Sequence, residues 1–280
     1  MTSTRAHRVT APFGARVVDI TRRSQHGPYI ELECVDLEGP RPHAGQFYML
    51  MASSRWGGGT GERPFLGRAF SVLRATSPPG SEQGVALQFL VEDVGPGTNR
   101  LCELELGDGL SLVGPLGNGF APPRDGRRAL LVGGGVGIAP LAIWRDELGE
   151  AATVLLGFRD ADHAAGAQLL ANPRVATDDG SSGHHGLVTE LLDDELDDHS
   201  HAEVYACGPP AMLKAVRLQC AVREIPAQLA LESGMACGFG ACFGCVVQTR
   251  SGYVRLCVDG PVLDGADLGP EAFTGIGAGH

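Results

Sequence analysis

The sequence lacks the features that mark several classes of protein. It has no apolar run of about 18 residues or more, so no membrane span is expected. Its net charge of −11 at pH 7 argues against a nucleic-acid surface. No apolar signal segment follows Met1, so we expect a cytoplasmic chain with reduced cysteines. With 43% hydrophobic and 20% charged residues, the composition is that of a globular protein.

Four cysteines near the C-terminus are the most informative residues present. Cys237, Cys242 and Cys245 have the C-x4-C-x2-C spacing of plant-type [2Fe–2S] ligation, and Cys257 follows as a fourth thiol. Glycines between them let the backbone wrap around a compact core. The pattern predicts that these four thiolates bind a [2Fe–2S] cluster.

Two other interpretations of the cysteines compete with this one. Structural zinc also binds four cysteines, but usually from two paired knuckles, and only one short pair is present. Disulfides are the other alternative because the total of eight cysteines is even. A chain of 280 residues can, however, build a core without them. We expect Cys34, Cys102 and Cys220, which lie in apolar contexts, to be core residues.

The first half of the chain carries short β-rich apolar runs separated by turn residues. This spacing predicts a six-stranded antiparallel β-barrel over residues 1–123, with one short helix at Asn99–Leu104. The stretch Ala121–Gly126, rich in proline and glycine, marks its end. The predicted strands are Ala15–Ile20, Tyr29–Val35, Gln46–Met51, Ala69–Leu73, Val85–Val91 and Leu110–Val113.

Arg68, Ala69, Phe70 and Ser71 form an R-x-[FY]-S pattern on one of these strands. An arginine can bind a diphosphate bidentately, an aromatic ring can border a flavin, and a hydroxyl can hydrogen-bond to flavin N5. Alternation places Arg68 and Phe70 on one face and Ser71 on the other, unless the strand bends. The pattern indicates a bound flavin.

A second pattern, Gly95-Pro96-Gly97-Thr98, leads into the predicted helix. Thr98 is the expected N-cap, and free N–H groups at the helix start would suit a phosphate. Taken alone, a Gly-Pro-Gly-Thr segment is more often a plain turn. In this order after Arg68, it supports Gly97 and Thr98 as flavin contacts.

Beyond the boundary, the pattern changes to alternating strands and helices, which predicts a parallel, Rossmann-like α/β domain over residues 124–224. Strand Arg128–Val132 leads through a glycine turn into helix Leu141–Leu148, the setting of a dinucleotide loop. The motif is G-x-G-x-x-P rather than G-x-G-x-x-G, and a turn used only for packing is the alternative. The further predicted elements are strands Thr153–Leu156, Val175–Thr177 and Val204–Ala206, and helices near Asp162–Leu170, Val188–Leu192 and Ala211–Cys220.

The candidate NAD contacts come from two segments of this domain. Cys207, after strand Val204–Ala206, is expected beside the nicotinamide, or alternatively is a small buried residue. Arg159 and Asp160 follow the second strand and point to opposite preferences, so NAD and NADP both stay open. The candidate contacts are Gly133, Gly134, Gly135, Gly137, Pro140, Cys207, Gly208 and Pro209.

The order of these motifs resembles that of the ferredoxin–NADP reductase superfamily with a C-terminal [2Fe–2S] extension. More narrowly, the chain resembles the electron-transfer subunits of NAD-dependent (class 1B) dihydroorotate dehydrogenases. Two features depart from that family: Ala69 stands where proline is usual, and the glycine-rich loop Ser53–Gly67 matches nothing in it. Besides the cysteine segment, the resemblance rests on Gly114–Phe120, Thr177–Ser181, Gly186–Thr189 and Tyr253–Pro261.

The resemblance implies FAD, a [2Fe–2S] cluster in residues 225–280, and NAD. Its partner would be an FMN-containing dihydroorotate dehydrogenase catalytic subunit, in a heterotetramer of two of each. Electrons would pass from that FMN through the cluster and FAD to NAD+, in pyrimidine biosynthesis, with no organic-substrate site on this chain. The resemblance also implies flavin contacts at Leu90, Val91 and Glu92. The alternatives are another flavin and iron–sulfur reductase, of the ferredoxin:NADP or sulfide dehydrogenase type, and a zinc-stabilised binding module.

Overall fold

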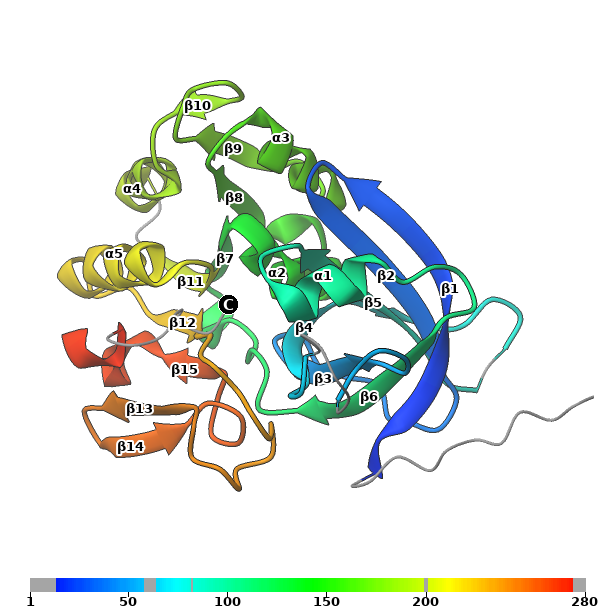
Figure 1. Ribbon diagram of the computed structural model, residues 1–280. Coiled ribbons are helices and arrows are strands. Elements are labelled where there is room, and N and C mark those ends of the chain that lie inside the picture. The colour runs from blue at the N-terminus through cyan, green and yellow to red at the C-terminus, as the bar shows by residue number, and fades with distance from the viewer. Residues whose placement is uncertain (1–13, 58–63, 82, 199–200, 274–280) are drawn as a thin grey trace, which may run out of the picture.

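The computed structural model describes residues 14–57, 64–81, 83–198 and 201–273. They form a β-barrel, a sheet with helices on both faces, and a C-terminal segment that lies against both (Figure 1). The predicted tail Thr274–His280 and part of the glycine-rich loop Ser53–Gly67 lie outside the described residues. Within these ranges, none of the helices has the length and apolar character needed to cross a bilayer.

The first half is a closed six-stranded antiparallel barrel, as predicted. The strand order is β1-β2-β5-β4-β3-β6, and β1 closes the barrel by pairing with β6. Closure leaves no unpaired strand edge. Inward-facing apolar side chains such as Tyr48, Leu50 and Phe89 fill the interior. The strands are β1 (Arg16–His26), β2 (Tyr29–Asp36), β3 (Phe47–Ala52), β4 (Arg68–Thr76), β5 (Val85–Glu92) and β6 (Gly109–Leu116).

The short helix α1 (Pro96–Cys102) begins earlier than predicted. Gly95 is its N-cap and Thr98 its third residue, so the prediction that Thr98 is the N-cap is wrong. The helix begins at Pro96 because proline's fixed φ suits the first helical position, where its missing N–H costs nothing. The Thr98 hydroxyl instead accepts hydrogen bonds from the N–H groups of Val94, at 2.9 Å, and Gly95, at 3.0 Å.

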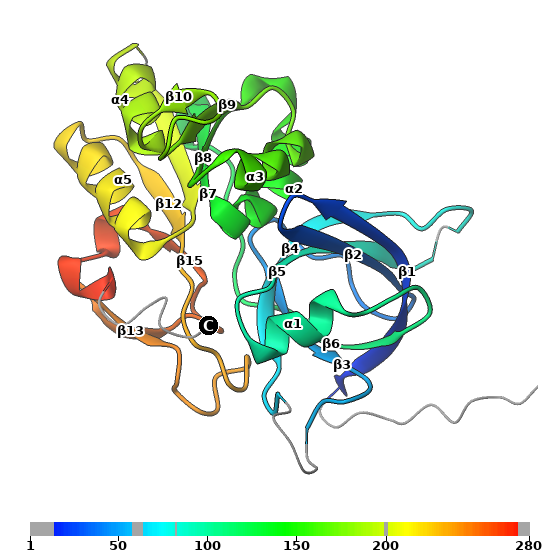
Figure 2. The ribbon, with the colours of Figure 1, turned by 45° about the horizontal axis from the view of Figure 1, so that its top comes forward.

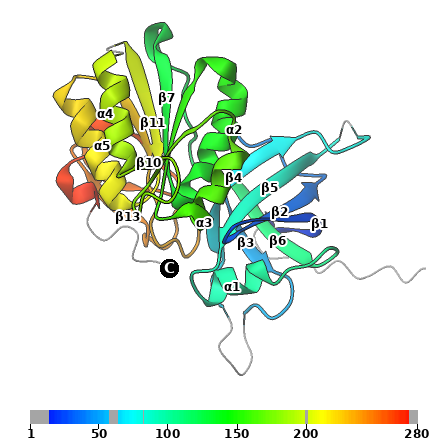
Figure 3. The ribbon, with the colours of Figure 1, turned by 90° about the horizontal axis from the view of Figure 1, so that it is seen from above.

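The second half is built on a seven-stranded sheet in the order β10-β9-β8-β7-β11-β12-β15, parallel except for β15. Helix α2 lies between this sheet and the barrel, and α4 and α5 cover the other face (Figure 3). The strands are β7 (Arg128–Gly134), β8 (Thr153–Phe158), β9 (Arg174–Thr177), β10 (His184–His185), β11 (Ala202–Cys207), β12 (Ala227–Ala230) and β15 (Val262–Asp264). The main helices are α2 (Ala139–Leu148), α4 (Val188–Asp198) and α5 (Pro210–Val222).

The helix predicted near Asp162–Leu170 is only partly formed. It consists of α3 (Ala161–Ala164) and a 3₁₀ turn at Ala165–Leu169. Gly166 lies in this turn against Tyr29 of the barrel, where an added Cβ would be 2.9 Å from the tyrosine ring. Where this segment contacts the barrel, it forms a 3₁₀ turn instead of the α-helix that the local sequence predicts.

The barrel and the sheet share one continuous apolar core. Ile138 and Trp144 of the α/β half pack in the same cluster as Tyr48 and Phe89 of the barrel. A second cluster on the far face of the sheet holds α4, α5 and the C-terminal segment. Figure 2 shows the two halves side by side, with the C-terminal segment beneath the sheet. The position of the barrel relative to the sheet is therefore set by a packed interface.

The residues after 224 are divided between the sheet and a separate hairpin. β12 and β15 extend the sheet, and the hairpin β13 (Val246–Thr249) with β14 (Gly252–Arg255) stands beyond it. Asn118, which follows β6 of the barrel, binds this segment: its Nδ2 donates to the carbonyls of Val258, at 3.0 Å, and Asp259, at 3.1 Å. The Gly114–Phe120 block thus anchors the C-terminal segment to the barrel.

Candidate flavin and iron–sulfur sites

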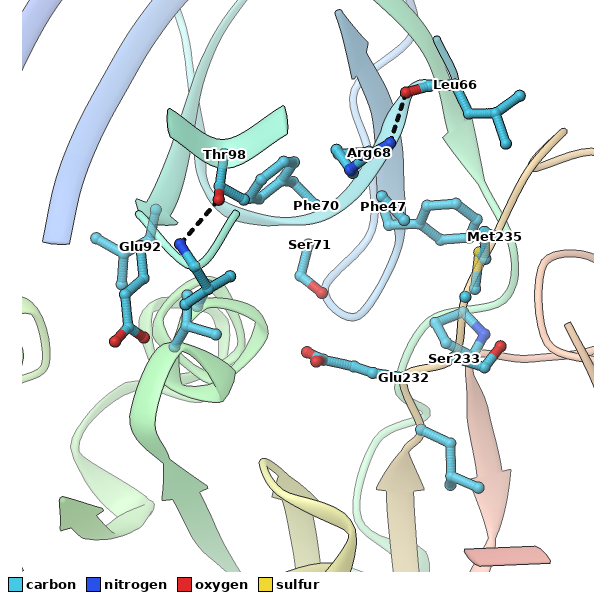
Figure 4. A pocket seen from close by; sticks show the side chains of 18 of the residues that line it. Phe47, Leu66, Arg68, Phe70, Ser71, Glu92, Thr98, Glu232, Ser233 and Met235 are labelled. Carbon is cyan, nitrogen blue, oxygen red and sulfur yellow. Dashed lines mark hydrogen bonds between the residues drawn. The ribbon is translucent and has the colours of Figure 1, made fainter. Parts of the chain in front are cut away.

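A cavity of about 570 Å³ opens where the barrel, the α/β half and the C-terminal segment meet. The barrel contributes its R-x-[FY]-S strand to the cavity wall, and the α/β half contributes the turn before α2. The segment just before the cysteines forms the third wall (Figure 4). The lining residues are Phe47, Leu66, Arg68, Ala69, Phe70, Ser71, Leu90, Glu92, Val94, Thr98, Val136, Ala139, Leu231, Glu232, Ser233, Gly234, Met235, Ala236 and Pro261.

Arg68 lines the cavity beside the start of α1. Its Nη1 donates to the carbonyl of Leu66 at 2.7 Å. The backbone of Gly97 is so near that an added Cβ would lie 2.5 Å from Arg68 Nε. Absence of a side chain at Gly97 therefore lets the guanidinium lie against the start of α1.

The four residues of the R-x-[FY]-S pattern all line the cavity. Simple alternation would have turned Ser71 away from Arg68 and Phe70. The register of β4 against β5 shifts between Val72 and Arg74, directly after Ser71. Such an irregularity bends a strand, and a bend lets Ser71 face the cavity together with Arg68 and Phe70.

The end of β5 supplies a further part of the wall. Leu90 and Glu92 line the cavity, whereas Val91 between them is fully buried in the barrel core. Since side chains alternate along a strand, a contact from Val91 to a cavity ligand would have to come from its backbone.

Glu232 is a cavity residue that sequence reasoning missed. It enters from the side opposite Ser71, and the two polar groups face the same space (Figure 4). Behind it, Cys207 Sγ lies 3.9 Å from Glu232 Oε1. The sequence does contain one signal for Glu232, because it is the charged residue that begins the cysteine segment.

Cys207 is fully buried and does not line the cavity. Burial, followed by the nearby Glu232 carboxylate, raises the pKa of its thiol well above the ordinary value. The cysteine therefore stays a neutral thiol at neutral pH, packed behind the cavity wall.

The two predicted nucleotide segments lie side by side. An added Cβ on Gly137 would be 2.7 Å from both the Cys207 carbonyl and Gly208, and one on Gly134 would be 2.8 Å from Pro209. Val136 and Ala139 of the same turn reach the flavin cavity. Pro140 is buried in the first turn of α2. The turn thus joins the segment after β11 to the cavity. Gly133 lies near the end of β7, and Gly135 is the first residue of the turn.

Arg159 and Asp160 lie at the end of β8 and contact each other. Asp160 caps α3 by accepting from the His163 N–H at 2.9 Å, and its Oδ1 lies 2.6 Å from His163 Nδ1. The backbone hydrogen bond from His163, then that residue's side chain, lowers the pKa of Asp160. Arg159 Nε is 3.5 Å from Asp160 Oδ2. The two opposite charges therefore offset each other.

The four predicted ligand cysteines lie together beside β13 and β14, as two pairs. Cys245 and Cys257 are buried, with sulfur atoms 3.2 Å apart. The Cys242 side chain is in hydrogen-bonding reach of Cys237. In the described residues, no group of three or more His, Cys, Asp or Glu side chains is arranged to hold a single metal ion. A [2Fe–2S] cluster is bound by four cysteine thiolates, which is the number that these two pairs supply.

Backbone N–H groups point at the sulfur atoms. Burial raises the pKa of the Cys237 thiol, but hydrogen bonds from the N–H groups of Cys242 and Phe239, from the Cys242 side chain and from the Ala241 N–H outweigh it and lower that pKa to about 6. The Gly244 N–H lies 3.4 Å from Cys242 Sγ. N–H donors of this kind stabilise thiolate ligands and tune a cluster's reduction potential. The loop is therefore suited to a thiolate-bound cluster.

The remaining thiols agree with the core prediction only in part. Cys34 and Cys220 are buried, whereas Cys102 is half-buried. All eight cysteines are free, so the structure contains no disulfide.

Fold and site together define a reductase of the ferredoxin–NADP reductase type with an added iron–sulfur segment. Residues 232–269 match the family model described as the iron–sulfur cluster binding domain of dihydroorotate dehydrogenase B. Over 233 residues, the chain is 34% identical to the dihydroorotate dehydrogenase B (NAD(+)) electron transfer subunit of Clostridium perfringens, covering 81% of this chain and 87% of that one. The chain belongs to the family of dihydroorotate dehydrogenase B electron transfer subunits.

Other relatives agree with this assignment. The subunit of the same name from Desulforamulus reducens is 33% identical over 262 residues, which is 90% of this chain and 95% of that one. Among solved structures, an NADH-dependent reduced ferredoxin–NADP oxidoreductase is 26% identical with a TM-score of 0.74, covering 91% of this chain and 90% of that chain. A Neisseria gonorrhoeae ferredoxin NADP+ reductase with bound FAD and NADP shares the fold, with a TM-score of 0.58 at 20% identity over 75% of this chain and 91% of that one.

Proposed function

We propose that this chain carries electrons from the FMN of a dihydroorotate dehydrogenase catalytic subunit, through a [2Fe–2S] cluster and FAD, to NAD+. Bound flavin supplies the conversion between single-electron transfer and two-electron hydride transfer. The resulting complex serves pyrimidine biosynthesis by removing the electrons of dihydroorotate oxidation. This chain has no organic-substrate site in the proposal.

One structural observation carries the proposal: the wall of the flavin cavity continues directly into the cluster loop. Ala236 lines the cavity, and the next residue is the candidate ligand Cys237. The loop is packed on the barrel, because an added Cβ on Gly238 would lie 2.6 Å from Met49 Cγ. A short, fixed separation between the two cofactor sites is what electron transfer requires.

Four of the predicted flavin contacts have distinct roles in this proposal. Arg68 binds the FAD diphosphate, Phe70 borders the flavin, Ser71 donates to it, and Thr98 orders the helix start. NAD binds across the glycine turn and the segment after β11. The proposed FAD contacts are Arg68, Ala69, Phe70, Ser71, Leu90, Val91, Glu92, Gly97 and Thr98; the NAD contacts are Gly133, Gly134, Gly135, Gly137, Pro140, Cys207, Gly208 and Pro209; the cluster ligands are Cys237, Cys242, Cys245 and Cys257.

The catalytic partner docks, in this proposal, over the cluster loop. Large apolar side chains are exposed on this loop and on β14: Phe239 is 48% and Phe243 63% exposed in the loop, and Tyr253 is 75% exposed on the strand. Exposed apolar groups that gather on one surface favour a protein interface. Docking at this surface brings the partner's FMN near the cluster. We propose a heterotetramer of two subunits of each kind, working in the cytoplasm, where free cysteines stay reduced.

Co-expression with an FMN-containing dihydroorotate dehydrogenase subunit tests this function. The purified complex should contain FMN, FAD and iron, and should reduce NAD+ with dihydroorotate. This chain alone should show flavin and iron–sulfur absorption and oxidise NADH with an artificial dye, but should be inert to dihydroorotate. A chain that binds flavin and a cluster, but forms no complex with such a subunit, would contradict the proposed partner.

A second candidate is a subunit of another flavin and iron–sulfur NAD(P)H oxidoreductase. The similarity to the NADH-dependent reduced ferredoxin–NADP oxidoreductase, over 91% of this chain, favours it as the alternative. The two functions differ in the electron donor. A complex that ignores dihydroorotate but reduces NAD(P)+ with reduced ferredoxin would establish the alternative.

A further inference from the structure

We propose that Arg255 is a positioning residue for the cluster: it fixes the cysteine loop against the strand that leads to the fourth cysteine, and it sets the cluster's reduction potential. The inference rests on the proposed cluster at Cys237, Cys242, Cys245 and Cys257. It concerns how this chain orients its own groups toward that cluster.

Arg255 is the last residue of β14, two positions before Cys257. Its Nη1 donates to the carbonyl of Gly240 at 3.2 Å, which lies in the loop between Cys237 and Cys242. Its guanidinium carbon is 5.3 Å from the centroid of the Phe243 ring, between Cys242 and Cys245. One side chain thus holds two points of the loop that carries three of the ligands.

The contact with Gly240 has a direct consequence for a sulfur ligand. The carbonyl of Gly240 and the N–H of Ala241 belong to one planar peptide unit and point in opposite directions. The Ala241 N–H lies toward Cys237. By binding the carbonyl, Arg255 orients that N–H at the sulfur. Gly240 also has φ +86°, a conformation that glycine adopts readily, so the peptide can turn this way.

Arg255 is itself held in place. Its backbone N–H donates to Asp259 Oδ2 at 2.8 Å, and its Nε lies 3.6 Å from the same oxygen. The side chain remains about one third exposed. A guanidinium fits these contacts because its planar fork can donate at one edge while its face covers a ring, which a lysine ammonium cannot do.

A fixed positive charge and an oriented N–H both favour the reduced, more negative cluster. Arg255 should therefore raise the reduction potential. Removing the charge should change the equilibrium constant for one-electron reduction by about tenfold, equivalent to about 59 mV. Loss of the loop contacts should also let chelators remove the iron faster.

The test compares three variants of the full chain by redox titration monitored by electron paramagnetic resonance, and by the rate of iron loss to a chelator. Arg255→Gln should lower the midpoint potential by about the amount above and speed iron loss several-fold. Arg255→Lys keeps the charge but not the paired loop contacts, so its potential should lie between those of wild type and Arg255→Gln, and it should still lose iron faster than wild type. Arg250→Gln, an equal charge change at the β13–β14 turn, should match wild type in both measurements.

The outcomes separate this inference from the function on which it rests. Wild-type protein without an iron–sulfur signal would overturn the proposed cluster itself. With the cluster present, equal potentials in Arg255→Gln and Arg250→Gln would overturn the role in setting the potential. Wild-type iron retention in Arg255→Lys would overturn the role in holding the loop, and this variant decides that role if Arg255→Gln retains no cluster.

Discussion

The sulfur atoms of Cys245 and Cys257 lie 3.2 Å apart at the open end of the β13–β14 hairpin, although the whole hairpin separates the two residues in sequence. The antiparallel pairing of Val246 with Arg255 brings the two thiols together. The N–H of Cys257 also lies 3.5 Å from Cys245 Sγ. The hairpin therefore completes the ligand set by joining the fourth cysteine to the loop of the first three.

Cys257→Ser should remove or destabilise the cluster, because a hydroxyl is a poorer ligand for iron than a thiolate. Iron content and visible iron–sulfur absorption should fall, and dihydroorotate-dependent reduction of NAD+ should stop. NADH oxidation with an artificial dye should partly survive, since the flavin cavity is intact. Cys102→Ser, which changes a half-buried cysteine outside the cluster, is the control. A full cluster content in Cys257→Ser would show that Cys257 is not a ligand.

Arg68→Gln should weaken FAD binding by about tenfold to a hundredfold, the worth of a lost hydrogen bond to a charged group. The guanidinium beside Gly97 is the candidate diphosphate ligand. Bound FAD after dialysis, and the dissociation constant from flavin fluorescence, measure the effect. Arg55→Gln is the matched control, because the side chains of Arg55 and of its partner Glu103 are exposed, at 59% and 45%. Equal FAD retention by the two variants would exclude Arg68 as a phosphate ligand.

Gly137→Ala should raise the KM for NADH and lower the free energy of unfolding by about 1–3 kcal/mol, the usual cost of overpacking. The new Cβ would lie 2.7 Å from backbone atoms of Cys207 and Gly208, which cannot move aside as a flexible side chain can. Steady-state kinetics and denaturant titration are the measurements. Gly126→Ala, with φ +66° and no neighbouring atom within 4 Å, should lose stability through backbone strain yet leave the KM unchanged. An unchanged KM in Gly137→Ala would remove the turn from the nucleotide site.

Cys34, Cys207 and Cys220 should resist iodoacetamide at pH 8 in the native protein. Burial raises the pKa of all three thiols, that of Cys220 to about 12. Only the thiolate reacts, and at a pH below a raised pKa most of the group stays protonated. Reactivity should therefore increase only as the pH approaches that raised value or the protein unfolds. Mass spectrometry of labelled peptides measures the reaction, with denatured protein as the control. Rapid labelling of Cys207 in the native protein would contradict the prediction.

The elements that depend on local pattern were predictable. Alternating apolar runs gave six barrel strands, and the strand–glycine–helix pattern gave β7 and α2, because both signals come from neighbouring residues. Where helix α1 begins was misjudged, since Thr98 looks like an N-cap until Pro96 is given its preferred first position. The helix predicted near Asp162–Leu170 is longer than α3, because the contact of Gly166 with Tyr29 involves a residue of the barrel that is distant in sequence.

The site was predictable where a motif carries its own geometry. C-x4-C-x2-C and R-x-[FY]-S identified the cluster loop and the flavin strand from sequence. Glu232 was missed because its role depends on Ser71 and Cys207, which are far from it in the chain. That all four residues of the flavin motif reach the cavity depends on the register shift after Ser71, which strand alternation does not contain.

The sequence by itself determined the kinds of chemistry: thiolates at a cluster spacing, an arginine and hydroxyl for a flavin, and a glycine turn for a dinucleotide. Those are properties of short segments. Only the tertiary structure decided their order in space. The packing of the C-terminal segment against both the barrel and the sheet puts Ala236 in the cavity wall and Cys237 next to it. The separation between the flavin cavity and the cluster loop is set by contacts between segments that are distant in sequence, and no local pattern contains those contacts.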